Sequence, residues 1–175
     1  RQYFTLIKDD LSFVYRLGYQ STIFGNAPFF YQSQVITSYL TGAYNEGLGG
    51  SQTLRGVLRN RVLGDGCVYG NFELRWKPLY FTLFNQDIYI GLDAFYDVGR
   101  VTKKIETPGN LELMFNRPGF TDRNYSDYFN VGAEKFHHSA GMSLMIVMNR
   151  NFIIAVDVGK AFNEQDGNIG FAIGL

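Results

Sequence analysis

Three features of the sequence predict an all-β fold, in the form of an antiparallel transmembrane β-barrel. Aromatic residues make up 17% of the chain, with 16 Phe and 12 Tyr, whereas Pro occurs only 4 times. Such side chains suit the pleated surface of a sheet. Several segments alternate apolar and polar residues with period two over more than ten positions, longer than the ~5–6 residues of an ordinary strand. Short and long connections also alternate, as in outer-membrane barrels with short periplasmic turns and longer outer loops.

Alternation predicts seven strands. They are expected at residues 3–8, 11–24, 67–84, 88–103, 140–148, 152–161 and 169–175. Short turns are expected at 9–10, 85–87 and 149–151, and longer connections at 25–66, 104–137 and 162–168. A soluble sandwich or lipocalin-like barrel also alternates, so it stays as the alternative fold.

Composition excludes several other classes. The 16 basic and 16 acidic residues balance, so no overall field recruits nucleic acid. The chain has no apolar run long enough for a transmembrane helix. Cys67 is the single cysteine, which rules out an internal disulfide.

The strand count predicts that the chain is one part of a wider barrel. Single-chain bacterial barrels have an even number of strands and at least eight, and small ones have interiors filled by side chains. We therefore expect residues 1–175 to form the C-terminal seven or so strands of a barrel of about sixteen. The 25–66 connection would fold into the lumen, and the 104–137 connection would lie outside the cell.

The glycine-rich stretch at residues 49–57 is the first candidate site. Glycines at 49, 50 and 56 permit tight turns and close backbone approach around Arg55. A guanidinium presents a planar fork of donors and calls for a carboxylate partner. The alternative is a plain surface turn with a solvated arginine.

One face of the predicted sheet supplies carboxylates for Arg55. This polar face, taken as the lumen, carries Arg16, Gln20, Asn71, Glu73, Arg75, Asp93 and Asp97. Glu73 follows the long loop and Asp97 lies on the next strand, so a loop folded inward would place Arg55 between them. Alternatively, both carboxylates are ordinary solvated lumen residues.

Three motifs together resemble the BamA/TamA-type outer-membrane assembly and translocation superfamily, also called the bacterial surface antigen family. The loop motif comprises Gly49, Gly50, Leu54, Arg55, Gly56 and Val57. The stretch 70–75 is similar to the family's strand after that loop, and Phe95, Asp97 and Gly99 match its Phe-x-Asp-x-Gly strand motif. Val57 departs from the family pattern, which has an aromatic residue there, and the chain stops at Leu175 where family barrels typically end in an aromatic residue.

The resemblance implies that Arg55 tethers the lumen loop to Glu73 and Asp97. It implies insertion or translocation of β-rich client proteins at the bacterial outer membrane, through a weak seam between first and last strands. The seam strand would be 169–175, with pairing weakened by Gly170 and Gly174. Expected partners are the outer-membrane lipid bilayer, client proteins, accessory lipoproteins, the rest of the barrel and periplasmic domains. No cofactor, metal or covalent catalysis is expected.

Two other functions are alternatives. The barrel would anchor and export a fused enzyme, such as a patatin-like phospholipase, or it would be a passive porin. His137 and His138 are expected to be solvated loop residues rather than metal ligands, and Met142, Met145 and Met148 to pack on a strand.

Overall fold

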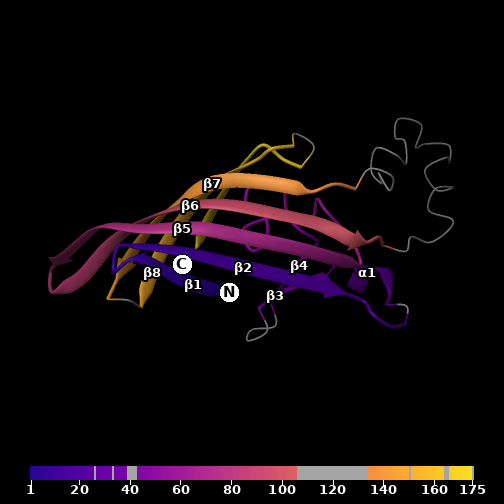
Figure 1. Ribbon diagram of the computed structural model, residues 1–175, viewed down its shortest axis with the longest axis horizontal. Coiled ribbons are helices and arrows are strands. Elements are labelled where there is room, and N and C mark those ends of the chain that lie inside the picture. Colours follow the sequence, from indigo (N-terminus) through magenta and orange to yellow (C-terminus); the bar gives the residue numbers. More distant parts are fainter. Residues whose placement is uncertain are drawn as a thin grey trace.

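The protein is all-β and is built on one seven-stranded antiparallel sheet (Figure 1). The computed structural model describes residues 1–25, 27–32, 34–38, 43–105, 134–149, 151–163 and 166–174. The sheet strands are β1 (Gln2–Ile7), β2 (Leu11–Ser21), β5 (Gly66–Leu83), β6 (Gln86–Lys103), β7 (His137–Met148), β8 (Phe152–Ala161) and β9 (Ile169–Gly174). They pair in the order β1-β2-β5-β6-β7-β8-β9. The seven predicted strands are therefore confirmed.

Short turns join the strands at one end of the sheet, as predicted, although the β5–β6 turn lies at 84–85 rather than 85–87. Leu83 pairs with Gln86, and the two residues between them, Phe84 and Asn85, both have positive φ, at 49° and 60°. This is the geometry of a type I′ hairpin turn, which matches the twist of the flanking strands. Asp9 and Asn149 adopt positive φ in the other two turns, and Asp and Asn tolerate this conformation better than most residues.

Some strand bounds differ from those expected. β2 ends at Ser21 rather than residue 24, and β7 begins at His137 rather than residue 140. The β5–β6 register shifts between Trp76 and Leu79, around Pro78, because proline has no N–H to donate to the ladder. Residues 106–133, most of the expected outer loop, and Leu175 lie outside the described residues.

The 25–66 connection contains regular structure that the sequence did not predict. It holds α1 (Phe29–Gln32) and a second sheet of β3 (Gln34–Ser38) and β4 (Ala43–Glu46). The side-chain amide of Gln20 on β2 donates to Gln34 O at 2.5 Å and accepts from Ile36 N at 3.0 Å. One glutamine thus holds β3 against β2 as a neighbouring strand would. Elements of four or five residues are too short to show a period.

The connection and the sheet share a buried core. It comprises Val35, Leu48, Leu54, Val57, Val62, Cys67, Tyr69, Val101 and Ala161. These residues come from both the connection and the strands, so the connection packs on one face of the sheet. The described sheet is open, with β1 and β9 at its two edges. Among the described residues, no helix has the length and apolar character needed to cross a membrane.

Candidate functional site: the tethered loop

The loop at residues 48–62, here called the tethered loop, is closed at its base and packed against the sheet. Leu48 and Val62 form an antiparallel bridge in which Leu48 N donates to Val62 O at 2.8 Å. At its centre the Thr53 hydroxyl accepts from Gly49 N at 2.8 Å and donates to Gly49 O at 3.0 Å. Ends brought together with internal packing are typical of Ω-loops, which are often functional.

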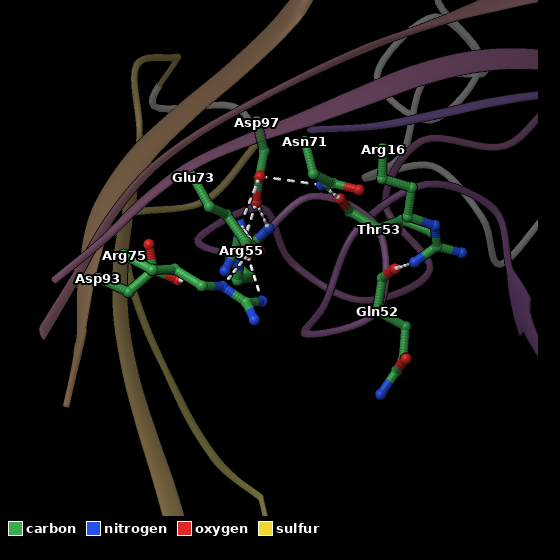
Figure 2. Close-up of polar contacts among 9 residues, drawn as sticks. All are labelled: Arg16, Gln52, Thr53, Arg55, Asn71, Glu73, Arg75, Asp93 and Asp97. Atoms are coloured by element: carbon green, nitrogen blue, oxygen red, sulfur yellow. Dashed lines mark hydrogen bonds and ion pairs between the residues drawn. The ribbon is translucent and has the colours of Figure 1, made fainter. Parts of the chain in front are cut away.

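Arg55 lies at the centre of the site and binds Asp97 through three hydrogen bonds (Figure 2). Its backbone N and side-chain Nε each donate to Asp97 Oδ2 at 2.9 Å, and a terminal nitrogen donates to Oδ1 at 2.8 Å. Asp97 is 0% exposed and Arg55 8% exposed. A two-pronged, charge-assisted pair of this kind fixes both position and orientation.

Glu73 is the second carboxylate on Arg55. Its Oε1 lies 3.0 Å from the terminal nitrogen of Arg55, and its Oε2 accepts two bonds from Arg75. Glu73 is itself buried, at 7% exposed. A buried carboxylate needs its charge compensated, and here one guanidinium from the loop and one from β5 do so.

Phe95 supplies an apolar support for the same guanidinium. The Arg55 Cζ lies 3.7 Å from the centre of the Phe95 ring, a cation–π distance. The ring lies over Gly141, its partner on β7, where an added Cβ would come within 2.5 Å of the ring. Gly141 therefore makes room for Phe95, and Phe95 in turn supports Arg55.

Asn71 links the loop backbone to the carboxylate. Its Nδ2 donates to Thr53 O at 2.5 Å and to Asp97 Oδ1 at 2.9 Å. Nearby, Arg16 donates to Gln52 O at 3.1 Å (Figure 2). Arg16 also donates to the Tyr69 hydroxyl at 2.8 Å. The strands β2, β5 and β6 thus each bind the loop through a polar side chain.

Gly56 brings the loop into direct contact with backbone of β8 and β9. A Cβ on Gly56, whose φ is +90°, would lie 2.7 Å from Gly159 C, and one on Gly170 would lie 3.1 Å from Gly56 Cα. Leu58 N also donates to Asp166 O at 2.8 Å. The loop therefore contacts the same face of β5, β6, β8 and β9, and the sheet curves around it.

The family-like motifs meet in space. Leu54 packs on Gly99, where an added Cβ would lie 3.1 Å from Leu54 Cδ1. Arg55 binds Asp97 and Gly56 contacts Gly159, so three consecutive loop residues each have a partner on the sheet. Val57 is 3% exposed and belongs to the core.

The charge on Arg55 is held firmly. Burial alone would lower the pKa of its guanidinium, but the hydrogen bond and charge of Asp97, followed by the charges of Glu73 and Asp157, raise that pKa above its ordinary value. Arg55 therefore stays protonated and does not serve as an acid.

Additional polar groups lie beside the pair. Asp93 on β6 lies directly opposite Ser143 on β7, which lies opposite Asp157 on β8. Asp93 Oδ1 and Ser143 Oγ are buried and have no hydrogen-bond partner among the described residues. Asp157 also lines a cavity of about 210 Å³ between the tethered loop and the β8–β9 hairpin.

The predicted ion pairs of Arg55 with Glu73 and Asp97 are thus present, and a solvated surface arginine is excluded. The roles of Asn71, Gly141 and Gly159 were not predicted, because each depends on how the tethered loop and Phe95 pack against the sheet. Gly170 of the expected seam strand contacts the loop, whereas Gly174 has open space around it.

The expectation of two solvated histidines is wrong for His137. His137 is 9% exposed and its Nδ1 lies 2.7 Å from Asp166 Oδ2. His138 points to the opposite face, where its Nδ1 lies 2.5 Å from the Tyr96 hydroxyl. No group of three or more His, Cys, Asp or Glu side chains suited to a metal occurs among the residues described.

Comparisons with family models, with curated proteins and with solved structures found no match to this chain.

Proposed function

We propose that this chain forms part of the outer-membrane β-barrel of a BamA/TamA-like factor, which inserts or translocates proteins at the bacterial outer membrane. One observation carries the proposal: Arg55 is bound to buried carboxylates on the polar face of a sheet whose other face is apolar and exposed. A loop of this kind would occupy the lumen, and the apolar face would contact lipid.

The apolar face is continuous across the sheet. Its exposed members include Phe4, Leu17, Tyr19, Leu74, Trp76, Tyr96, Met142, Leu144, Ile146, Val158, Phe171 and Ile173. Water-soluble proteins rarely expose apolar patches above a few hundred Å². Lipid chains cover such a surface without cost, and the alternation of apolar and polar faces is that of a membrane barrel.

Aromatic side chains lie near both ends of this face. At one end Tyr96, His138 and Phe162 pack together, with Phe136 against His138. At the other end Phe152 is 47% exposed and Phe84 89% exposed. Phe152 and Phe162 are ten positions apart, about 33 Å along a strand and ~25 Å across a membrane at a tilt of about 40°. This agrees with the ~25 Å apolar band of outer-membrane barrels.

Open edges support an incomplete barrel. An exposed β1 edge and an exposed β9 edge would aggregate in water unless other strands paired with them. We infer that the remaining strands of a barrel of about sixteen pair with these edges. β9 would then be one side of a seam, and its residue Gly170 contacts the tethered loop.

The proposed partners follow from this placement. They are the outer-membrane bilayer, β-rich client proteins, the rest of the barrel with its periplasmic domains, and accessory lipoproteins. Assembly of this kind needs no covalent step, so no nucleophile or cofactor is assigned. A barrel that anchors a fused phospholipase is the second candidate, since the same sheet and loop would serve it.

Client insertion by the full-length protein tests the proposal. The protein is reconstituted in liposomes with an unfolded eight-stranded barrel as client, and folding is followed by the client's altered gel mobility without heating. We expect the wild-type protein to accelerate client folding over empty liposomes. Arg55→Ala should lose most of that acceleration, because its loop no longer docks on the polar face.

Two controls separate the alternatives. The barrel of each variant must retain its own heat-sensitive gel mobility, and single-channel conductance is measured in parallel. Acceleration by wild type that Arg55→Ala lacks supports the assembly function. A correctly inserted protein that conducts ions but gives no acceleration contradicts it and favours a porin.

A further inference from the structure

His137 lies between carboxylates from two different connections. Its Nδ1 is 2.7 Å from Asp166 Oδ2, and its Nε2 is 3.6 Å from Glu134 Oε1. Asp166 belongs to the hairpin between β8 and β9, and Glu134 to the end of the 104–137 connection. His137 and Asp166 are 9% and 4% exposed, so this contact is shielded from solvent.

Both carboxylate residues make a further contact that holds another segment. Glu134 Oε1 accepts from Val101 N at 2.8 Å, beside the end of β6. The backbone O of Asp166 accepts from Leu58 N, in the tethered loop, at 2.8 Å. The imidazole therefore joins the segment that holds Glu134, the β8–β9 hairpin and, through Asp166, the tethered loop.

The number of donors decides which protonation state this arrangement favours. A neutral imidazole carries one N–H, which satisfies Asp166 and leaves the Nε2 lone pair facing the Glu134 carboxylate. The protonated ring has a donor on each nitrogen and faces a carboxylate on both sides. The 3.6 Å separation at Nε2 is an ion-pair distance and is too long for a hydrogen bond, so charge decides this contact.

We propose that His137 is a proton-operated latch: the protonated ring fastens the segment 134–136, the β8–β9 hairpin and the tethered loop together, and deprotonation loosens them. Every contact of the latch lies within this chain, so the latch does not depend on the proposed function.

The two side-chain charges that face the His137 ring are both negative, and one cation lies beside them. Glu134 and Asp166 face the ring, Arg100 of β6 lies near Glu134, and β6 places Gly99, without a side chain, opposite His137. The tethered loop contributes the backbone N–H of Leu58. Burial alone would raise the pKa of Glu134, but His137 and the Val101 N–H lower it, so Glu134 stays ionised as the pH falls toward 5.

Hydrogen exchange of the full-length protein in its membrane or detergent tests the latch. Protection at the Val101 and Leu58 amides is measured from pH 5 to pH 8.5 and corrected for intrinsic exchange. A protonated ring should hold both amides, and we expect protection to fall by about tenfold as the pH rises through the histidine titration. His137→Gln should remove this pH dependence, since a glutamine amide does not titrate.

The neighbouring histidine supplies the matched control. His138 lies on the opposite face against Tyr96, so His138→Gln should keep the wild-type pH dependence. Glu134→Gln should reduce the pH dependence of protection at the Val101 amide. Asp166→Asn should reduce the pH dependence of protection at the Leu58 amide. Wild-type protection that does not change with pH, or a profile flattened by His138→Gln and not by His137→Gln, would overturn the proposal.

Discussion

Arg55 and Asp97, 42 positions apart in the sequence, are joined by three hydrogen bonds, one of them from the Arg55 backbone. The backbone bond matters because it holds the loop itself and not only the end of a flexible side chain. Together with Asn71, which donates to both Asp97 and Thr53 O, it ties the loop main chain to β5 and β6.

Asp97→Asn should release the tethered loop. The change removes the buried negative charge and leaves Arg55 with Glu73 as its remaining close partner, at a cost of ~3–5 kcal/mol to loop docking. Amide exchange over residues 53–57 should rise by orders of magnitude. Asp9→Asn is the control, because Asp9 is an exposed turn residue with positive φ, which Asn also tolerates. Equal exchange in both variants would show that Asp97 does not hold the loop.

Lysine should not replace arginine at position 55. A Lys ammonium can bind one carboxylate oxygen, but it lacks the planar fork that meets both Asp97 oxygens and stacks on Phe95. Protease cleavage within the loop should be nearly as fast in Arg55→Lys as in Arg55→Ala. Arg59→Lys, at an exposed position of the same loop, should behave as wild type. Full protection in Arg55→Lys would mean that charge alone suffices.

Alanine at Gly56 or Gly159 should displace the loop from β8. The added Cβ would lie 2.7 Å from Gly159 C in the first case and 3.0 Å from Arg55 C in the second, and Gly56 also has positive φ. We expect a lower thermal unfolding temperature and faster loop cleavage in both variants. Gly174→Ala is the matched control, since no atom lies within 4 Å of the new Cβ. A loss of the same size in Gly174→Ala would point to general sheet destabilisation.

Acidification should weaken the anchor at the end of the long connection. Burial alone would raise the pKa of Asp65, but Lys103 at 2.5 Å and the Thr22 hydroxyl at 2.6 Å lower it below its ordinary value. A lowered folded-state pKa stabilises the fold above the ordinary value of about 4, and this contribution is lost as the pH falls further. Asp65→Asn should therefore lower the unfolding temperature at pH 7 and have little effect near pH 3. An equal loss at both pH values would contradict the ionic anchor.

Cysteines placed at adjacent positions of β7 should distinguish the surroundings of the two faces of the sheet. Leu144 is 42% exposed on the apolar face, whereas Ser143 is 4% exposed on the polar face. In a Cys67→Ser background, Leu144→Cys should react with a maleimide dissolved in the lipid and resist a charged, water-soluble one. Ser143→Cys should react slowly with both. Rapid reaction of Leu144→Cys with the charged reagent would place this face in water and exclude the membrane barrel.

The sheet could be predicted because each strand carries its own pattern. Alternation along 140–148 assigns Met142 and Leu144 to one apolar face, and the structure places both on the exposed apolar face of the sheet. The partners of Arg55 were predictable because few carboxylates lie on the polar face. The roles of Gly141 and Gly159 could not be predicted, since the close contacts that require glycine there are made by Phe95 and by the loop. The buried position of His137 was not predicted either, because its partner Asp166 lies 29 positions away, in the β8–β9 hairpin.

A double-mutant cycle on client insertion measures whether Arg55 and Asp97 act in assembly through their mutual contact. Arg55→Ala, Asp97→Ala and the double variant are reconstituted as full-length protein, each with its barrel shown to be folded by gel mobility. Both single changes remove the contact between Arg55 and Asp97. We therefore expect either single variant to slow client folding about as much as the double variant does. Additive losses would show that the residues act separately, and wild-type rates in all three would show that the tethered loop has no part in assembly.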